Sequence, residues 1–383
     1  MRLIFNIFLI LLAAVSCRKE DGIISSTSMN VIYPDPEVGD VKGLFLLNEG
    51  NMGSNKATLD YFDYETGVYT KNIFPERNPL VDYELGDVGN DIQIYNDRIY
   101  AVINCSNLVE VMTLSTAEHI GSFSIPNCRY IAFDGDYAYV SSYAGPVEID
   151  PNARLGYVAK VDLETLTVID ECTVGYQPEQ MAIAGDKLYV ANSGGYRVPN
   201  YDNTVSVIDL NTFTETKQIE VAINLHRLIL DTYGYLWISS RGDYGSTPSR
   251  TYVLNTQNDE VVKMLELPNS NMTRCGDTIY VISTEWNNSS STNSINYYKV
   301  DVVSQQVASA NIITDGTASN ITIPYGIAVN PETKEIFITD AKDYITPGKI
   351  HCYSNEGVLK WSATTGDIPA HIAFTTEKLQ SIN

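Results

Sequence analysis

Residues 180–192 read Gln-Met-Ala-Ile-Ala-Gly-Asp-Lys-Leu-Tyr-Val-Ala-Asn, which is an apolar strand, a tight turn and a second apolar strand. The chain repeats this pattern, and its seven inner-strand cores contain Asp91, Tyr130, Gln180, Arg227, Asn271, Gly326 and His371. Successive cores lie roughly 40 to 55 residues apart, which is the period of a four-stranded propeller blade. The repeat therefore predicts an all-β fold, a seven-bladed β-propeller of four-stranded blades.

The first and last parts of the repeat complement each other. Residues 43–85 contain three strand patterns but lack an inner one, whereas 371–374 is an inner strand without a blade of its own. We expect this C-terminal strand to complete the N-terminal blade, because that leaves no unpaired inner edge. The propeller is expected to fill 41–383. Its other six blades are expected at 90–127, 128–177, 178–224, 225–269, 270–323 and 324–368.

The composition favours one closed β domain and excludes two classes of partner. No helical apolar periodicity follows the N-terminus, and 26 tyrosines accompany the alternating strand patterns. The net charge of -22 is spread along the chain. Such a surface repels nucleic acid and anionic lipid headgroups, so we expect neither to bind it directly.

The N-terminus has the pattern of an exported lipoprotein. Met1-Arg2 precedes an apolar run at 3–15, which is too short for a stable membrane span and is typical of a signal peptide. Residues 14–17 read Ala-Val-Ser-Cys and resemble a bacterial lipobox, in which Cys17 is lipidated and becomes the first mature residue. We therefore expect a signal peptide over 1–16 and membrane contact only through the lipid.

The residues after the lipobox suggest export to the cell surface. Residues 18–21 read Arg-Lys-Glu-Asp and resemble the surface-export signal of Bacteroidetes lipoproteins, although an ordinary charged linker has the same composition. Residues 21–40 lack strand patterning and contain Pro34 and Pro36, so 17–40 is expected to be a flexible tether. The expected location is the exposed surface of the outer membrane.

Five further cysteines follow the lipobox, an odd number for an oxidising compartment. Cys105 ends the second strand of one blade and Cys128 leads into the next, so both are placed near one face and a disulfide between them is expected. Cys172, Cys275 and Cys352 fall in or beside strands and are expected to be buried thiols.

The loops of the repeat differ between the two faces of the propeller. Short Asp/Gly/Asn turns form one face and are expected to reverse the chain only. The longer loops between second and third strands meet around the channel mouth on the other face, with the residues that enter each inner strand. Their Tyr, Trp, Arg and Asn side chains suit ligand recognition. The candidate ligand-binding residues are Asn51, Met52, Tyr130, Tyr143, Tyr196, Arg197, Tyr201, His226, Arg241, Tyr244, Trp286, Asn287, Tyr325, Tyr344 and His371. The alternative is that these aromatic side chains merely cover the tops of the blades.

Catalytic patterns are weak. Of the four histidines, His119 and His351 fall in outer strands and are expected to be structural, whereas His226 and His371 face the channel mouth. A metal-dependent, lactonase-like hydrolase would have to draw on a generic set of ligands, namely Glu49, Asp91, Glu179 and Asn271. No nucleophile motif or acid pair stands out. We expect no enzyme activity, no catalytic cofactor and no bound metal.

Two phrases carry a resemblance to known families. Residues 187–192 followed by 205–210, Val-Ser-Val-Ile-Asp-Leu, resemble the YncE-like, surface-layer-type seven-bladed propellers, which have many functions. The lipoprotein start, the Tyr-rich loop face and residues 46–54, Leu-Leu-Asn-Glu-Gly-Asn-Met-Gly-Ser, together resemble the BtuG family of Bacteroidetes surface propellers.

The second resemblance implies a function. BtuG-like propellers capture corrinoids at the cell surface and cap the TonB-dependent outer-membrane transporter of vitamin B12. Cobalamin would then be a bound ligand, and the transporter would be the protein partner. The alternatives are a propeller that binds surface glycans or proteins and, less favoured, the lactonase-like hydrolase.

Overall fold

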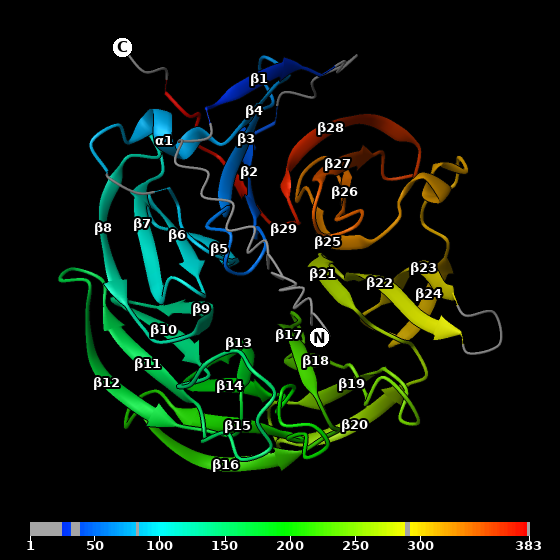
Figure 1. Ribbon diagram of the computed structural model, residues 1–383. Coiled ribbons are helices and arrows are strands. Elements are labelled where there is room, and N and C mark those ends of the chain that lie inside the picture. Colours follow the sequence, from blue (N-terminus) through cyan, green and yellow to red (C-terminus); the bar gives the residue numbers. More distant parts are fainter. Residues whose placement is uncertain (1–24, 32–38, 82–83, 288–291, 381–383) are drawn as a thin grey trace, which may run out of the picture.

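The computed structural model describes residues 25–31, 39–81, 84–287 and 292–380. Seven antiparallel sheets stand around a central axis, as Figure 1 shows. The predicted seven-bladed β-propeller is therefore confirmed. The predicted signal peptide (1–16) and the lipidation site Cys17 lie outside the described residues.

The blades follow one another along the chain. The first blade contains β1 (Thr27–Asn30), β2 (Gly43–Asn48), β3 (Thr58–Asp63) and β4 (Val68–Lys71), followed by the short helix α1 (Ile73–Arg77). The second blade contains β5 (Gly89–Tyr95), β6 (Arg98–Ile103), β7 (Leu108–Thr113) and β8 (His119–Ser124). The third contains β9 (Cys128–Asp134), β10 (Tyr137–Ser142), β11 (Tyr157–Asp162) and β12 (Thr167–Thr173). The fourth contains β13 (Pro178–Ala184), β14 (Lys187–Asn192), β15 (Thr204–Asp209) and β16 (Thr214–Glu220).

The remaining blades continue the ring. The fifth contains β17 (Leu225–Leu230), β18 (Tyr235–Ser240), β19 (Arg250–Asn255) and β20 (Glu260–Leu265). The sixth contains β21 (Asn271–Cys275), β22 (Thr278–Asn287), β23 (Thr292–Asp301) and β24 (Gln306–Ala310), and the short helix η1 (Thr317–Asn320) follows it. The seventh contains β25 (Pro324–Val329), β26 (Ile336–Asp340), β27 (Pro347–Tyr353) and β28 (Leu359–Asp367), before the final strand β29 (Pro369–Thr375).

Burial changes across each blade in the way that the sequence patterns require. In the middle strand β14, every residue after Lys187 is buried, because neighbouring blades cover both of its faces. In the outer strand β16, only Ile219 is fully buried, and the rest is rich in Thr, Glu and Lys. Charged side chains of this kind protect an exposed strand edge from pairing with another chain.

The core is divided among the interfaces between blades. Within the described residues, seven apolar clusters form, one between each pair of neighbouring blades. The cluster between the fifth and sixth blades, for example, packs Trp237 and Val253 against Met272 and Val281. Burial of this apolar surface holds the ring together and makes the inner-strand ends a rigid frame.

The ring closes as the sequence predicts. Strand β29 pairs with β2 in antiparallel register, with Leu44 opposite Phe374 and Leu46 opposite Ile372. The C-terminal strand is therefore the inner strand of the N-terminal blade, and Figure 1 shows the two side by side. This closure buries the last inner edge.

The predicted tether contains an element that the sequence does not signal. Residues Thr27–Asn30 form β1, which pairs with β4 and gives the first blade a fifth, outermost strand. The burial pattern of β1 is almost entirely exposed. Such a strand is held by backbone hydrogen bonds and needs no alternation of apolar residues, so its sequence resembles a linker.

The predicted disulfide does not form in this structure, because Cys105 and Cys128 are both free thiols. The Cys128 Sγ atom lies 3.4 Å from the Leu108 carbonyl oxygen and 3.6 Å from that of Ile103, and burial raises the pKa of its thiol to about 12. Two cysteines on the same face of the propeller form a disulfide only if their sulfur atoms also come within bonding distance. Of the three expected buried thiols, Cys172 and Cys352 are buried and Cys275 is half-buried.

The sixth blade also differs from expectation. Residues 285–293 were expected to be a loop, but β22 extends to Asn287 and β23 begins at Thr292, so the two form a long hairpin. Trp286 and Asn287 therefore lie in a strand, and their side chains are outside the described part of the chain. In the described residues, no helix is long and apolar enough to cross a membrane.

Candidate ligand-binding pocket

A repeated backbone contact brings the long loops to the channel mouth. In most blades, the first residue after the second strand donates its N–H to the carbonyl oxygen of the residue that precedes the inner strand. The bond is 2.9 Å from Arg241 to Asn224 and 3.2 Å from Tyr143 to Asn127. Both acceptors have a positive φ, of 55° and 45°, a conformation that Asn tolerates better than most residues. Each loop therefore begins beside the entrance to an inner strand.

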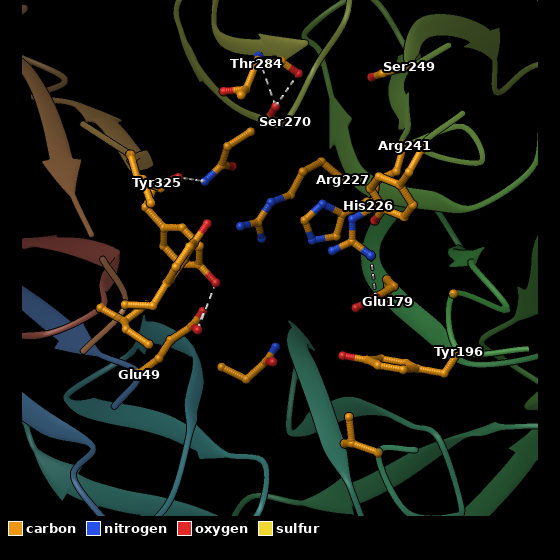
Figure 2. A pocket seen from close by; sticks show the side chains of 18 of the residues that line it. Glu49, Glu179, Tyr196, His226, Arg227, Arg241, Ser249, Ser270, Thr284 and Tyr325 are labelled. Carbon is orange, nitrogen blue, oxygen red and sulfur yellow. Dashed lines mark hydrogen bonds and ion pairs between the residues drawn. The ribbon is translucent and has the colours of Figure 1, made fainter. Parts of the chain in front are cut away.

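A cavity of about 1000 Å³ lies where these loops and inner-strand ends meet. The side chains at the loop-face ends of six inner strands line it, namely Asn90, Arg129, Glu179, His226, Asn271 and Tyr325. All of these except Asn271, which is the first residue of its strand, are the second residue of an inner strand, and they differ in residue type. Figure 2 shows side chains from several blades converging on this space.

The carboxylate of Glu179 is the centre of one cluster. Its side chain is fully buried, and it accepts hydrogen bonds from Arg129 Nη2 and Arg241 Nη1, both at 3.2 Å, and from the Tyr143 hydroxyl at 2.6 Å. Burial opposes ionisation of Glu179, but the two guanidinium groups outweigh it and hold the pKa of the carboxyl below its usual value. One carboxylate thus joins the third, fourth and fifth blades.

A second cluster surrounds Tyr130. The Tyr130 hydroxyl lies 3.0 Å from His226 Nε2 and accepts a hydrogen bond of 3.0 Å from Arg227 Nη1. Burial, together with the positive charges of Arg241 and Arg227, holds the pKa of His226 well below its usual value. His226 is therefore neutral near pH 7 and contributes a polar ring without a charge.

The opposite side of the cavity is built by the first and seventh blades. The Tyr325 hydroxyl donates to Glu49 Oε2 at 2.9 Å, and His371 Nε2 lies 3.6 Å from Glu49 Oε1. The ring of Tyr325 meets that of Tyr344 edge to face, with centroids 6.0 Å apart. Asn271 Nδ2 donates to the Tyr325 carbonyl oxygen and ties the sixth blade to this side.

The upper part of the cavity is more apolar and more exposed. Met52, Ile149 and Tyr244 are 65, 74 and 71 % exposed, and Tyr196 is 38 % exposed. All four line the cavity. Tyr244 has a φ of 58°, which is strained for a bulky residue. Exposed aromatic rings above a polar floor suit a large ligand with both polar and apolar parts.

The structure brings nine of the fifteen candidate residues to the cavity wall: Asn51, Met52, Tyr130, Tyr196, His226, Arg241, Tyr244, Tyr325 and Tyr344. Tyr143 lies behind the wall, bonded to Glu179, and His371 lies behind it beside Glu49. Arg197 instead stacks over the Tyr176 ring at 3.5 Å, and Tyr201 is half-buried away from the wall. The side chains of Trp286 and Asn287 lie outside the described residues.

The cavity wall also contains four residues that the sequence does not predict, and three that it predicts only as possible metal ligands. The first group is Arg129, Arg227, Asn90 and Asn104, and the second is Glu49, Glu179 and Asn271. The second and third residues of the inner strands change type from blade to blade, but this variation does not indicate which of them face one another across the cavity. Over the described ranges, no three His, Cys, Asp or Glu side chains gather closely enough to hold a metal ion.

Solved structures share the fold at low identity. A hypothetical selenium-binding protein from Sulfolobus tokodaii is 10 % identical, with a TM-score of 0.63 over 91 % of this chain and 98 % of that chain. A quinonprotein alcohol dehydrogenase-like protein from Bacteroides thetaiotaomicron is 15 % identical, with a TM-score of 0.59 over 88 and 79 %. Hydrazine synthase from Kuenenia stuttgartiensis is 17 % identical, with a TM-score of 0.58 over 70 and 77 %. At such identities, the likeness shows the propeller fold alone.

Comparison of the sequence with family models identifies the family of this chain. None of the curated proteins with which it was compared matches it. A family model described as a domain of unknown function, DUF5074, matches residues 42–375, which is nearly the whole propeller. The chain belongs to this DUF5074 family.

Proposed function

We propose that this protein is a surface lipoprotein that binds cobalamin or a related corrinoid at the long-loop face and passes it to an outer-membrane transporter. The observation that carries the proposal is the wide cavity over the channel mouth, with arginine and amide groups on its floor and exposed tyrosines above them. The proposal is of a binding protein, so no catalytic residue is assigned.

The size and chemistry of the cavity support a corrinoid. Its volume of about 1000 Å³ is at the upper end of ordinary small-molecule sites, which favours a large ligand. A corrinoid is broad, flat and fringed with amides. The rings of Tyr196 and Tyr244 would cover apolar area at little entropic cost, while Asn90 and Asn271 would face amide groups.

The lipid anchor and the transporter complete the proposal. Cys17 would hold the propeller at the outer surface of the outer membrane, where a transporter of the TonB-dependent class would receive the ligand. Protease treatment of intact cells tests the location. We expect degradation of the wild-type protein on whole cells, and loss of membrane attachment in the Cys17→Ala variant; protection of the wild-type protein would contradict surface exposure.

Visible absorption tests the ligand directly. The purified propeller is mixed with cyanocobalamin at micromolar concentration, desalted and scanned. We expect the corrinoid absorption to stay with the protein. Colourless protein would refute corrinoid binding; glycan arrays would then test a carbohydrate ligand, and ester hydrolysis that a chelator abolishes would indicate the metal-dependent hydrolase.

A further inference from the structure

Positive charge is concentrated on the cavity floor of an acidic protein. The chain carries a net charge of -22, yet Arg129, Arg227 and Arg241 line one side of the cavity. Glu179 is the carboxylate that bonds to Arg129 and Arg241. Two of these three guanidinium groups are paired with that one carboxylate, so the four groups together carry a net charge of two positive units. Such a cluster attracts an anion that the rest of the surface repels.

Arg227 is the member of the cluster that is open to a ligand. Among the described residues, it forms no ion pair with a carboxylate, and its Nε atom has no hydrogen-bond partner. Its Nη1 atom donates to the Tyr130 hydroxyl, and its guanidinium lies 5.3 Å from the centre of the Tyr130 ring. Figure 2 shows the Arg227 side chain pointing into the middle of the pocket.

The Tyr130 hydroxyl and the His226 ring, which lie beside Arg227, together have one hydrogen-bond donor without an acceptor. The hydroxyl of Tyr130 and Nε2 of His226 share one hydrogen bond, and His226 Nδ1 has no partner in the described part of the chain. In either tautomer of the neutral ring, one N–H or O–H hydrogen of this pair is left without an acceptor. His226 is only 7 % exposed, so the deficit lies in a buried part of the cavity wall.

The other acidic groups near the channel are bonded elsewhere. Glu49 accepts from Tyr325 and faces His371 on the far side of the cavity. Asp91, below the floor, accepts from the Ile131 N–H at 3.2 Å and from Gln93 Nε2 at 3.2 Å. Glu285 lines the cavity at the exposed end of β22. Within the described ranges, none of these three carboxylates therefore bonds to the guanidinium group of Arg227.

We propose that Arg227, with Arg241 and the Tyr130–His226 pair beside it, forms a subsite for a singly charged phosphate ester group of the ligand. The planar guanidinium fork matches the two non-bridging oxygens of such a group, and the one hydrogen that the Tyr130–His226 pair leaves without an acceptor would bond to one of these oxygens. This inference rests on the proposed function of the cavity. Cobalamin carries one phosphodiester in its nucleotide loop, whereas cobinamide has the corrin ring without that loop.

Calorimetric titration with cyanocobalamin and dicyanocobinamide tests the subsite. The Arg227→Met variant is expected to bind cyanocobalamin about 10- to 100-fold more weakly, the range for a lost hydrogen bond to a charged group. Its affinity for dicyanocobinamide is expected to stay within about twofold. Arg227→Lys keeps the charge without the fork and is expected to be intermediate. Circular dichroism confirms that each variant is folded.

The matched control is Arg274→Met. Arg274 lies in the inner strand β21 and bonds to the turn at Gly276, on the opposite face from the cavity. The substitution removes the same charge from an inner strand, so it is expected to leave both affinities unchanged. Equal loss for both corrinoids in Arg227→Met would assign Arg227 to the corrin ring and overturn the phosphate subsite, as would no loss for either.

The outcomes also separate this inference from the proposed function. If wild-type protein binds both corrinoids equally well, corrinoid capture stands and the phosphate subsite is refuted. If it binds neither, the proposed function fails, and the singly charged diester diphenyl phosphate becomes the probe. Salt-sensitive binding of diphenyl phosphate that Arg227→Met abolishes would still support the subsite, and absence of that binding would refute it.

Discussion

The two faces of the propeller are built on the same strands but by different kinds of contact. On the turn face, many hydrogen bonds join residues two or three positions apart: Asp162 Oδ1 accepts from the N–H groups of Glu164 and Thr165, and Asp209 Oδ1 does the same for Asn211 and Thr212. The bonds that close these two turns lie within a single blade. Contacts between blades also occur there, such as the ion pair of Lys187 with Asp259 at 3.0 Å.

The loop face depends on contacts between blades. Glu179 is 50 residues from Arg129 and 62 from Arg241, and the three come from different blades. Tyr130 and His226 are 96 residues apart. Residues at equivalent places in the repeat differ here in charge and size, so the contacts are not repeated around the ring. The residues that are alike in every blade therefore build the scaffold, and the residues that differ between blades build the candidate site.

The largest effect is expected where a single side chain holds three blades together. The Glu179→Gln variant leaves Arg129 and Arg241 without a countercharge in a buried cluster, so unfolding free energy should fall by about 3–5 kcal/mol. Urea denaturation measures it. The control Asp209→Asn, on the turn face, should cost less than about 0.5 kcal/mol. Equal losses in both variants would remove the distinction between the faces.

The second-largest effect is expected on ligand affinity, which should fall after substitutions on the loop face and not after substitutions on the turn face. Tyr196→Ala combined with Tyr244→Ala removes two exposed rings from the cavity, and we expect cyanocobalamin affinity to fall by about 100-fold or more. Stability should change little, because both rings are exposed and neither hydroxyl bonds to Glu179. The control Tyr233→Ala removes a ring of 50 % exposure from the turn face and should leave affinity unchanged. Unaltered binding in the double variant would mean that the ligand lies elsewhere.

The pH dependence of the unfolding free energy should depend on a buried residue of the scaffold, His351, that does not line the cavity. Burial lowers the pKa of His351 in β27 to about 4, whereas the unfolded chain titrates near 6.5. The unfolded state thus binds more protons between these values, and stability falls as pH drops from 6.5 to 4, by roughly 2–3 kcal/mol for this group. His351→Gln should flatten that slope in pH-dependent denaturation and leave cyanocobalamin affinity intact. An unchanged slope would contradict the burial argument.

A turn on the opposite face should give the smallest effect. Asn255 Oδ1 accepts from the Gln257 N–H at 2.9 Å, and Asn255→Ala removes that one bond. We expect a loss of about 0.5–1.5 kcal/mol in urea denaturation and no change in ligand affinity. A large loss of affinity would show that the turn face communicates with the cavity.

The sequence predicts the scaffold well, because apolar alternation and repeat spacing are local signals. Closure by 371–374 follows from counting inner strands, and the pairing of β29 with β2 confirms it. Strand β1 could not be found in this way, since an exposed edge strand carries no apolar pattern. Neither could the state of Cys105 and Cys128, which depends on side-chain distances.

The cavity could be predicted only in part. Tyr196 and Tyr244 follow from loop composition, because aromatic residues in long loops are visible in the sequence. Arg129 and Arg227 lie inside strands that look structural, and their role depends on which residues face them from other blades. Pairings across 50 or more residues have no local signature, so the charged floor becomes visible only in the folded ring.

Hydrogen–deuterium exchange with and without cyanocobalamin tests most directly whether the loop face is the ligand-binding face. Bound ligand should slow exchange in the loops at 48–58, 142–157, 192–204 and 240–250 and leave the turns at 134–137, 184–187 and 209–214 unchanged. Protection of the turns with no protection of the loops, or no protection under saturating cyanocobalamin, would contradict the account.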